Sequence, residues 1–131
     1  MSKKFANTTT WVLRIIAALI LLQTLFFKFT AAEESVYIFS AIGMEPWGRI
    51  GTGVLELLSS VLILIPATTL YGSVLAIGLM TGAIFFHLTK LGISIQNDGG
   101  QLFIYAVVVL GCSVALVIIT RQRLMELLSN K

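Results

Sequence analysis

Four long apolar stretches leave this chain few choices of fold. They cover residues 11–29, 47–65, 70–88 and 101–119, and each is close to the roughly 20 residues that a helix needs to cross a bilayer core of about 30 Å. The chain of 131 residues is 57% hydrophobic and only 11% charged, which is too little polar surface for a water-soluble domain of this size. We therefore predict an all-α integral membrane four-helix bundle that forms a single membrane domain over residues 1–131.

The connection between the first two predicted spans is longer than the roughly 2 to 8 residues usual between bundle helices. Residues 33–43 begin with Glu33 and Glu34, continue with apolar side chains and end at Gly43. This pattern is typical of a short helix that lies on the membrane surface, where it would cover the outer mouth of the bundle. After the fourth span, residues 121–131 are predicted to form an amphipathic tail on the inner leaflet.

Basic residues are unevenly distributed between the two ends of the predicted bundle. With an even number of spans, the positive-inside tendency places both termini in the cytoplasm. The isoelectric point near 9.3 follows from the basic inner flanks and does not indicate nucleic-acid binding. Six basic residues lie on the side of the termini and three on the other, namely Lys3, Lys4, Arg14, Arg121, Arg123 and Lys131 against Lys28, Arg49 and Lys90.

Two features of the chain narrow its class further. The single cysteine, Cys112, can form no intramolecular disulfide, which excludes a thiol oxidoreductase that works with a cysteine pair. The first span has the basic residues and the small residues Thr30–Ala32 that would flank the apolar core of a cleaved signal peptide. Its apolar run exceeds the roughly 7 to 15 residues of such a core and Lys28 interrupts the approach to the small residues, so we expect the span to be retained.

An acidic residue, Glu56, lies near the middle of the second predicted span. It follows Trp47 by about 13 Å of helix, and a carboxylate at that depth costs about 3 kcal/mol unless it is protonated, paired or facing water. On a helical wheel Arg49 lies on the same face, seven residues away, so a water or a ligand group would bridge the two more readily than a direct pair. The wheel predicts that this polar stripe faces the bundle interior: Arg49, Thr52, Gly53, Glu56, Ser59 and Ser60.

The third predicted span carries the only histidine, His87. An ionisable group within a membrane is a functional candidate, although a satisfied interfacial histidine is an equally good interpretation. One histidine cannot form a bis-histidine haem site or a three-ligand zinc site within one chain, so no metal site is predicted. Gly78 and Gly82 permit close backbone approach between helices. On the other side of the span, small residues such as Ala76 and Ala83 leave room either for another helix or for a ligand.

Several polar residues are expected near the outer surface. Lys28 ends the first span, where a lysine that extends its amine to the interface is the favoured interpretation. Asn97 or Asp98 can cap the fourth helix. Asp98 is either only such a cap or a ligand-binding group, and Gln101 is either only a headgroup contact or a ligand-binding group; the two interpretations are equally good. These positions predict an outward-facing polar pocket with Glu56 at its floor. The candidate ligand-binding residues are Lys28, Arg49, Glu56, His87, Lys90, Gln101 and Tyr105, and Glu56 and His87 are the candidates for catalysis.

The order and spacing of several short motifs resemble the DoxX-like family of small four-helix bacterial membrane proteins. The motifs are Lys28, Ala41–Met44, Leu55–Glu56, Phe86–His87 and Asn97–Phe103. One departure is the inner turn Pro66–Thr69, where many members have an arginine. The resemblance implies a bacterial inner-membrane protein associated with quinone-linked redox chemistry, either as a subunit or as a partner of a redox enzyme.

Three functions remain open at this level. The first is a redox-associated subunit whose pocket binds a quinone or a similar amphipathic molecule, and which is at most an accessory subunit of an oxidoreductase. The second is a structural or assembly partner of a membrane complex, or a homo-oligomer, in which Glu56 serves packing. The third is a small proton-coupled transporter, for which the chain shows neither internal repeats nor broken spans.

Overall fold

A computed structural model describes residues 3–95 and 98–129. Within these residues every regular element is helical, which confirms the all-α prediction. The elements are α1 (Lys3–Phe29), α2 (Glu33–Ala41), α3 (Trp47–Leu64), the 3₁₀ turn η1 (Pro66–Thr68), α4 (Thr69–Phe86), the π-helical turn η2 (His87–Leu91) and α5 (Gln101–Ser129).

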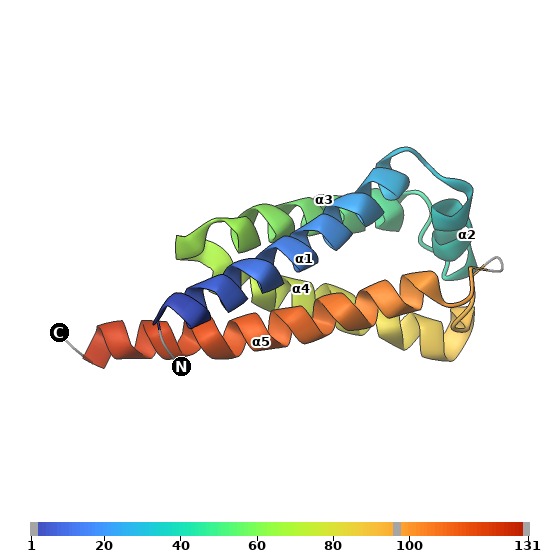
Figure 1. The fold of residues 1–131 in the computed structure, drawn as a ribbon. Coiled ribbons are helices and arrows are strands. Elements are labelled where there is room, and N and C mark those ends of the chain that lie inside the picture. The colour runs from blue at the N-terminus through green and yellow to red at the C-terminus, as the bar shows by residue number, and fades with distance from the viewer. Residues whose placement is uncertain (1–2, 96–97, 130–131) are drawn as a thin grey trace.

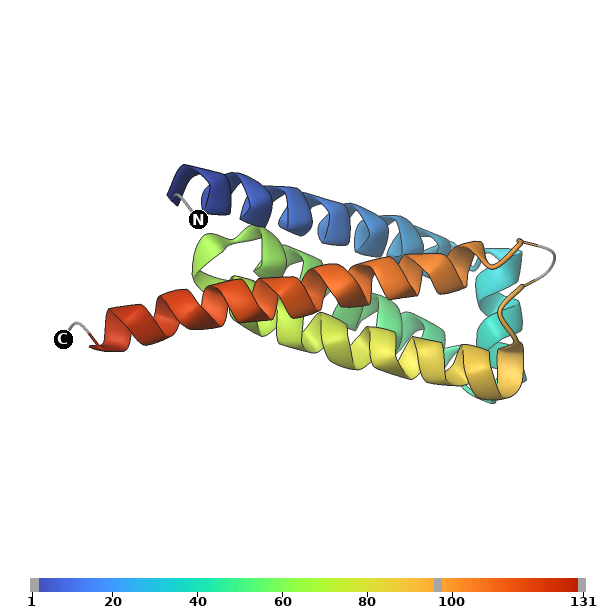
Figure 2. The same ribbon diagram turned by 60° about the horizontal axis from the view of Figure 1, so that its bottom comes forward.

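The four long helices form an antiparallel bundle (Figures 1 and 2). Helix α1 packs against α3 and α5, and α4 packs against the same two helices, so each long helix has two principal neighbours. The short helix α2 lies across one end, where it contacts α1, α3 and η2. We call this the cap end, and the opposite end, which holds both chain termini and η1, the terminal end.

The bundle has an apolar exterior, and its core combines aliphatic side chains with small and polar ones. Leu19, Phe26 and Trp47 are among its exposed large residues, while Ser59, Ser73 and Ala76 are fully buried. Four segments are long and apolar enough to cross a membrane, namely Asn7–Phe29, Trp47–Leu64, Pro66–Leu91 and Gln101–Gln122. Apolar surfaces that face outward and small residues at the helix contacts are what a lipid solvent favours, so the chain is a multi-pass membrane protein.

The terminal end is closed by hydrogen bonds to the last carbonyls of α3. Arg14 donates from Nε to the Ile63 carbonyl at 2.8 Å and from Nη2 to the Leu64 carbonyl. The Thr69 hydroxyl also donates to the Ile63 carbonyl, at 2.9 Å. The carbonyls at a helix C-terminus lack partners within the helix, so Arg14 is a buried cap of α3, whereas the sequence placed it among the basic residues that flank the membrane.

Close approach between α3 and α4 occurs at Gly72. A Cβ atom there would lie 2.6 Å from the Ile63 nitrogen and 2.8 Å from the Ser59 carbonyl oxygen, and Ser59 donates to the Gly72 carbonyl at 2.8 Å. The glycines singled out in the sequence, Gly78 and Gly82, have no heavy atom within 4 Å of such a Cβ. They border a cavity instead, so within this chain the close approach expected of them is wrong.

Three helix limits differ from the expected ones. Helix α1 begins at Lys3, whereas the apolar stretch in the sequence begins at Trp11, so Thr8–Thr10 lie within the helix. Helix α5 continues to Ser129 without a break, so the tail after residue 121 prolongs the fourth span as one helix. Helix α2 covers Glu33–Ala41, two residues short of the expected segment, and α3 begins at Trp47 directly after Pro46 as expected.

Candidate functional site

A buried ion pair joins α1 to α3 below the cap end. The Lys28 Nζ atom lies 3.0 Å from Oε1 and 3.4 Å from Oε2 of Glu56. The Thr24 hydroxyl donates to Oε2 at 2.9 Å. The Glu56 side chain is only 2% exposed and that of Lys28 15%. Both carboxylate oxygens therefore have charged or hydroxyl donors, as a buried carboxylate requires.

This contact contradicts the interpretation of Lys28 as an interface anchor. Lys28 lies one turn after Thr24 on α1, and the same helix face continues inward through Leu21 and Ala17, which are buried. The face that Lys28 shares with Thr24 packs toward α3, so its amine reaches the Glu56 carboxylate instead of the interface.

Arg49 is held by partners other than Glu56. Its Nε lies 2.9 and 3.0 Å from the two carboxylate oxygens of Glu45, and Nη1 donates to the Lys28 carbonyl at the end of α1. Among the described residues Arg49 and Glu56 form no direct pair, and the bridge by a water or a ligand group stays a prediction. Arg49 is buried and ties the start of α3 to the end of α1, outside the wall of the pocket described below.

His87 is buried at the junction of α4 and η2, with 5% of its surface exposed. Its Nδ1 lies 3.0 Å from the Gly92 carbonyl oxygen, and a carbonyl only accepts, so Nδ1 carries the hydrogen of this bond. Nε2 has no hydrogen-bond partner among the described residues. In the neutral ring Nε2 is then an acceptor, and the edge contact with Phe103 at 5.6 Å holds the ring in place.

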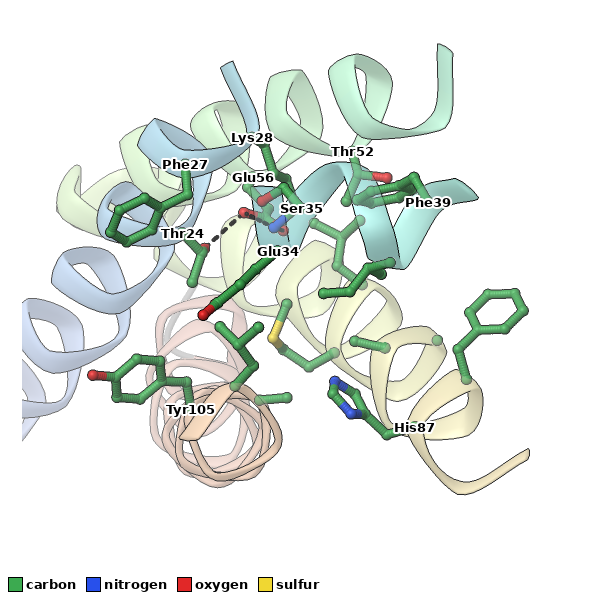
Figure 3. Close-up of a pocket in the computed structure, with 18 of the residues that line it drawn as sticks. Thr24, Phe27, Lys28, Glu34, Ser35, Phe39, Thr52, Glu56, His87 and Tyr105 are labelled. Atoms are coloured by element: carbon green, nitrogen blue, oxygen red, sulfur yellow. Dashed lines mark hydrogen bonds and ion pairs between the residues drawn. The ribbon is translucent and has the colours of Figure 1, made fainter. Parts of the chain in front are cut away.

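A cavity of about 690 Å³ lies between these groups, beneath α2 (Figure 3). It is bordered by the second half of α1, by α2, by Thr52 and Glu56 of α3, by α4 and by the first turns of α5. In Figure 3 Glu34 extends from α2 into the pocket, and the ring of His87 points into it from the side of α4. The polar lining residues include Gln23, Thr24, Lys28, Glu33, Glu34, Ser35, Thr52, Glu56, His87, Gln101 and Tyr105.

The structure brings together most, but not all, of the candidates from the sequence. Lys28, Glu56 and His87 border the cavity, as do Gln101 and Tyr105, whose side chains share a 2.7 Å hydrogen bond from Nε2 to the phenol oxygen. Lys90 is exposed and, like Arg49, does not border it. Among the described residues no three His, Cys, Asp or Glu side chains lie where they could hold a metal ion.

Asp98 caps the start of α5 and lies apart from the cavity. Its Oδ1 accepts from the backbone nitrogens of Gly100 at 2.8 Å and Ile95 at 2.9 Å, and Oδ2 accepts from Leu102 at 3.4 Å. Partial burial acts to raise the pKa of Asp98, but these backbone donors outweigh it and hold the pKa below its usual value. Asn97, the alternative cap, lies outside the described residues.

Sequence reasoning missed Thr24 and the role of the α2 acids in this site. Thr24 could have been found from its four-residue spacing to Lys28, which places the two side chains on one helix face. Glu33 and Glu34 were recognised only as the start of a surface helix. Their position on the cavity wall depends on how α2 folds back over the bundle, which no local pattern specifies.

Comparison with known proteins gives one positive result. The sequence model of the DoxX-like family matches residues 12–116, which include the second and third spans, most of the first and fourth spans, and every residue of the cavity wall. No curated protein and no solved structure shows a significant match to the chain.

Proposed function

Because the chain belongs to the DoxX-like family, we propose that it is a redox-associated membrane subunit whose pocket around Glu56 binds a quinone or a similar amphipathic molecule. The observation that carries this proposal is the cavity with the Lys28–Glu56 pair in its wall. Its volume of about 690 Å³ lies within the roughly 300–1,000 Å³ of small-molecule sites.

The cavity wall offers what each redox form of a quinone head requires. A quinone carbonyl accepts hydrogen bonds, and Lys28, Gln101 and Tyr105 supply donors on the wall. A quinol hydroxyl donates, and the Glu56 carboxylate and His87 Nε2 supply acceptors. The apolar part of the ligand would lie along the aliphatic lining, which includes Ile20, Leu21, Leu79, Met80 and Ala106.

Oxidation of a quinol releases two electrons and two protons, and the chain can take part directly only in the proton steps. Glu56 can accept one proton at its carboxylate and His87 one at Nε2. The electrons would pass to the redox centre of a partner oxidoreductase, so this chain is at most an accessory subunit of such an enzyme. A proton on Glu56 would also remove its attraction for Lys28, which is the more exposed member of the pair.

The direction in which the pocket faces follows from the basic residues. Lys3, Lys4 and Arg121 lie toward the terminal end, as does the arginine cap of α3. By the positive-inside tendency both termini would lie in the cytoplasm, in the inner membrane of a bacterium. The cap end, with its pocket, would then face the periplasm, from which protons could reach Glu56.

Binding of a neutral short-chain quinone, decylubiquinone, to the purified protein in lipid nanodiscs tests the proposal. We expect saturable binding that weakens at least tenfold in Glu56→Gln, because Gln lacks the charge that pairs with the Lys28 amine and cannot take a proton. Lys90→Gln is the matched control, since Lys90 is exposed and lies outside the cavity wall. Non-saturable binding to the wild-type protein, or equal binding by Glu56→Gln, would exclude the proposal.

A structural or assembly role is the second candidate, and the interhelical contacts of Lys28 and Arg49 favour it. Lys28 joins α1 to α3 through Glu56, and Arg49 joins the same helices through the Lys28 carbonyl, while Glu45 holds its side chain. In this case Glu56→Gln would lower thermal stability or recovery of a membrane complex with no change in ligand binding. Normal stability with lost quinone binding would argue against it.

A further inference from the structure

The ionisable groups of the cavity wall are unequal in sign. One lysine, Lys28, faces three carboxylates, those of Glu33, Glu34 and Glu56. Lys28 contacts both oxygens of Glu56, at 3.0 and 3.4 Å, so its charge is neutralised within the wall. Glu33 and Glu34 form no ion pair in the part of the chain that the structure describes. Both are exposed residues that also border the cavity, so two carboxylates without an ion pair lie at the edge of the pocket that α2 covers.

The other cations near the cap end do not offset these charges. Arg49 contacts both oxygens of Glu45 and lies outside the cavity wall. Lys90 is exposed to the surroundings and also lies outside the wall. In Figure 3 Glu34 reaches into the pocket from α2, on the side of Thr24 and Tyr105. A ligand head that passes α2 thus meets a carboxylate without a fixed counter-charge.

His87 gives an independent indication of the same preference. Only 5% of its surface is exposed. Its Nδ1 donates a hydrogen bond to the Gly92 carbonyl. Nε2 is left as an unpartnered acceptor on the pocket wall. Because His87 borders the cavity, this nitrogen can accept a hydrogen bond from a molecule in the pocket, and it favours a ligand that brings a hydrogen-bond donor.

Acidic residues are common in the first turn of a helix, because the helix dipole stabilises them there. That accounts for Glu33 and Glu34 at the start of α2. It does not account for the placement of this acidic turn over a cavity whose buried histidine also presents an acceptor. The dipole, equivalent to roughly half a unit charge, also falls short of two carboxylates.

We propose that the cavity selects lipid-soluble molecules whose head is neutral or cationic and donates hydrogen bonds, and that it excludes anionic amphiphiles. This inference rests on the proposed function only in taking the cavity to be a binding site for amphipathic molecules. It narrows the ligand class to protonated amines and uncharged molecules, and among the uncharged ones it favours hydroxyl compounds, such as the quinol form of a quinone, over heads that only accept hydrogen bonds. Small inorganic anions are excluded from the site by the same charges.

A series of probes that differ only in the head group tests the selection. Dodecylammonium, dodecanol and dodecanoate would be bound to the protein in phosphatidylcholine nanodiscs at pH 7, with protein-free nanodiscs as the blank for partition into lipid. We expect dodecylammonium to bind at least tenfold more tightly than dodecanoate, with dodecanol between them. Equal binding of the ammonium and carboxylate probes would overturn the inference, as would tighter binding of the carboxylate.

Variants of α2 locate the origin of the selection. Glu34→Gln and Glu33→Gln should each reduce the preference for the ammonium probe by about fivefold, the effect of one carboxylate in a partly hydrated site. The double variant should nearly abolish it. Glu45→Gln removes the same charge outside the cavity wall and should leave the preference within twofold. A preference that survives in the double variant would overturn the inference.

Decylubiquinone in the same assay separates this inference from the proposed function. If dodecylammonium binds and decylubiquinone does not, the quinone proposal fails and the inference stands. If decylubiquinone binds and dodecanoate binds as tightly as dodecylammonium, the inference fails and the quinone proposal stands. Absence of binding by every probe would overturn both.

Discussion

The two ends of the bundle each place a cation of α1 against α3, but they use different partners. At the terminal end Arg14 donates to the carbonyls of Ile63 and Leu64. At the cap end Lys28 contacts the Glu56 carboxylate beside the cavity. Backbone carbonyls are fixed dipoles that do not titrate, whereas a carboxylate can gain a proton. The terminal end is therefore suited to holding the helices together, and the cap end to responding to a ligand or a proton.

The largest effect is expected at the terminal end, for Gly72→Val. Any side chain at this position meets backbone atoms of α3, at 2.6 and 2.8 Å, and backbone cannot move aside as a flexible side chain can. We expect loss of folded protein, measured as the monodisperse fraction in size-exclusion chromatography. Gly78→Val, on the same helix with nothing within 4 Å of its Cβ, is the control, and equal losses for the two variants would contradict the close packing at Gly72.

At the cap end, removal of one member of the ion pair should be more harmful than removal of both. Glu56→Leu leaves the Lys28 amine without its partner, and breaking a buried pair typically costs about 3–5 kcal/mol. The double variant Lys28→Met with Glu56→Leu should regain most of this loss, while quinone binding stays absent. The measurement is the free energy of unfolding in mixed micelles. If the double variant were less stable than Glu56→Leu, the pair would not be the unit that we describe.

Arg14→Met tests whether the terminal end affects stability without affecting the pocket at the cap end. It removes the hydrogen bonds from a charged donor to the Ile63 and Leu64 carbonyls, of which Ile63 keeps only the Thr69 hydroxyl, and this should cost about 2–4 kcal/mol. Arg14 is remote from the cavity wall, so decylubiquinone affinity should be unchanged in the protein that folds. A tenfold loss of affinity at normal stability would show that the two ends are coupled.

The smallest effect is expected for the cap of α5. Because backbone donors lower the pKa of Asp98, its contribution is complete above its unfolded-state pKa of about 3.9 and is lost as the pH falls through the lower folded-state pKa. The site is largely open to solvent, so Asp98→Asn should cost less than about 1 kcal/mol at pH 7. The difference in melting temperature between wild type and variant should shrink as the pH falls below about 4, and a difference that stays constant or grows as the pH falls further would contradict this.

The class of fold was accessible from sequence because it depends on local composition. Four apolar windows of membrane length are enough to predict four spanning helices, and the structure confirms the helical bundle. Glu56 was equally visible, since an acidic residue inside such a window stands out whatever its partner. The α2 helix was visible because two acids before an apolar run mark the start of a surface helix.

The partners of these residues were not accessible in the same way. Both Arg49 and Lys28 were available to Glu56 in sequence, and the choice between them depends on the rotation of α1 relative to α3. Gly72 and Gly78 are the same type of residue on the same helix, yet of these two only Gly72 faces a neighbouring backbone. Arg14 was counted as a surface charge because its acceptors are main-chain carbonyls, which leave no signal in the sequence.

The lengths of the connections to α2 set a limit on how the cap can move. Three residues join it to α1 and five join it to α3, and at about 3.5 Å per extended residue these tethers reach at most about 11 and 18 Å. Helix α2 therefore cannot swing clear of the bundle unless the ends of α1 or α3 unwind. A ligand in the cavity beneath α2 is therefore expected to exchange by rotation of side chains and by small shifts of this helix, which is anchored at both ends.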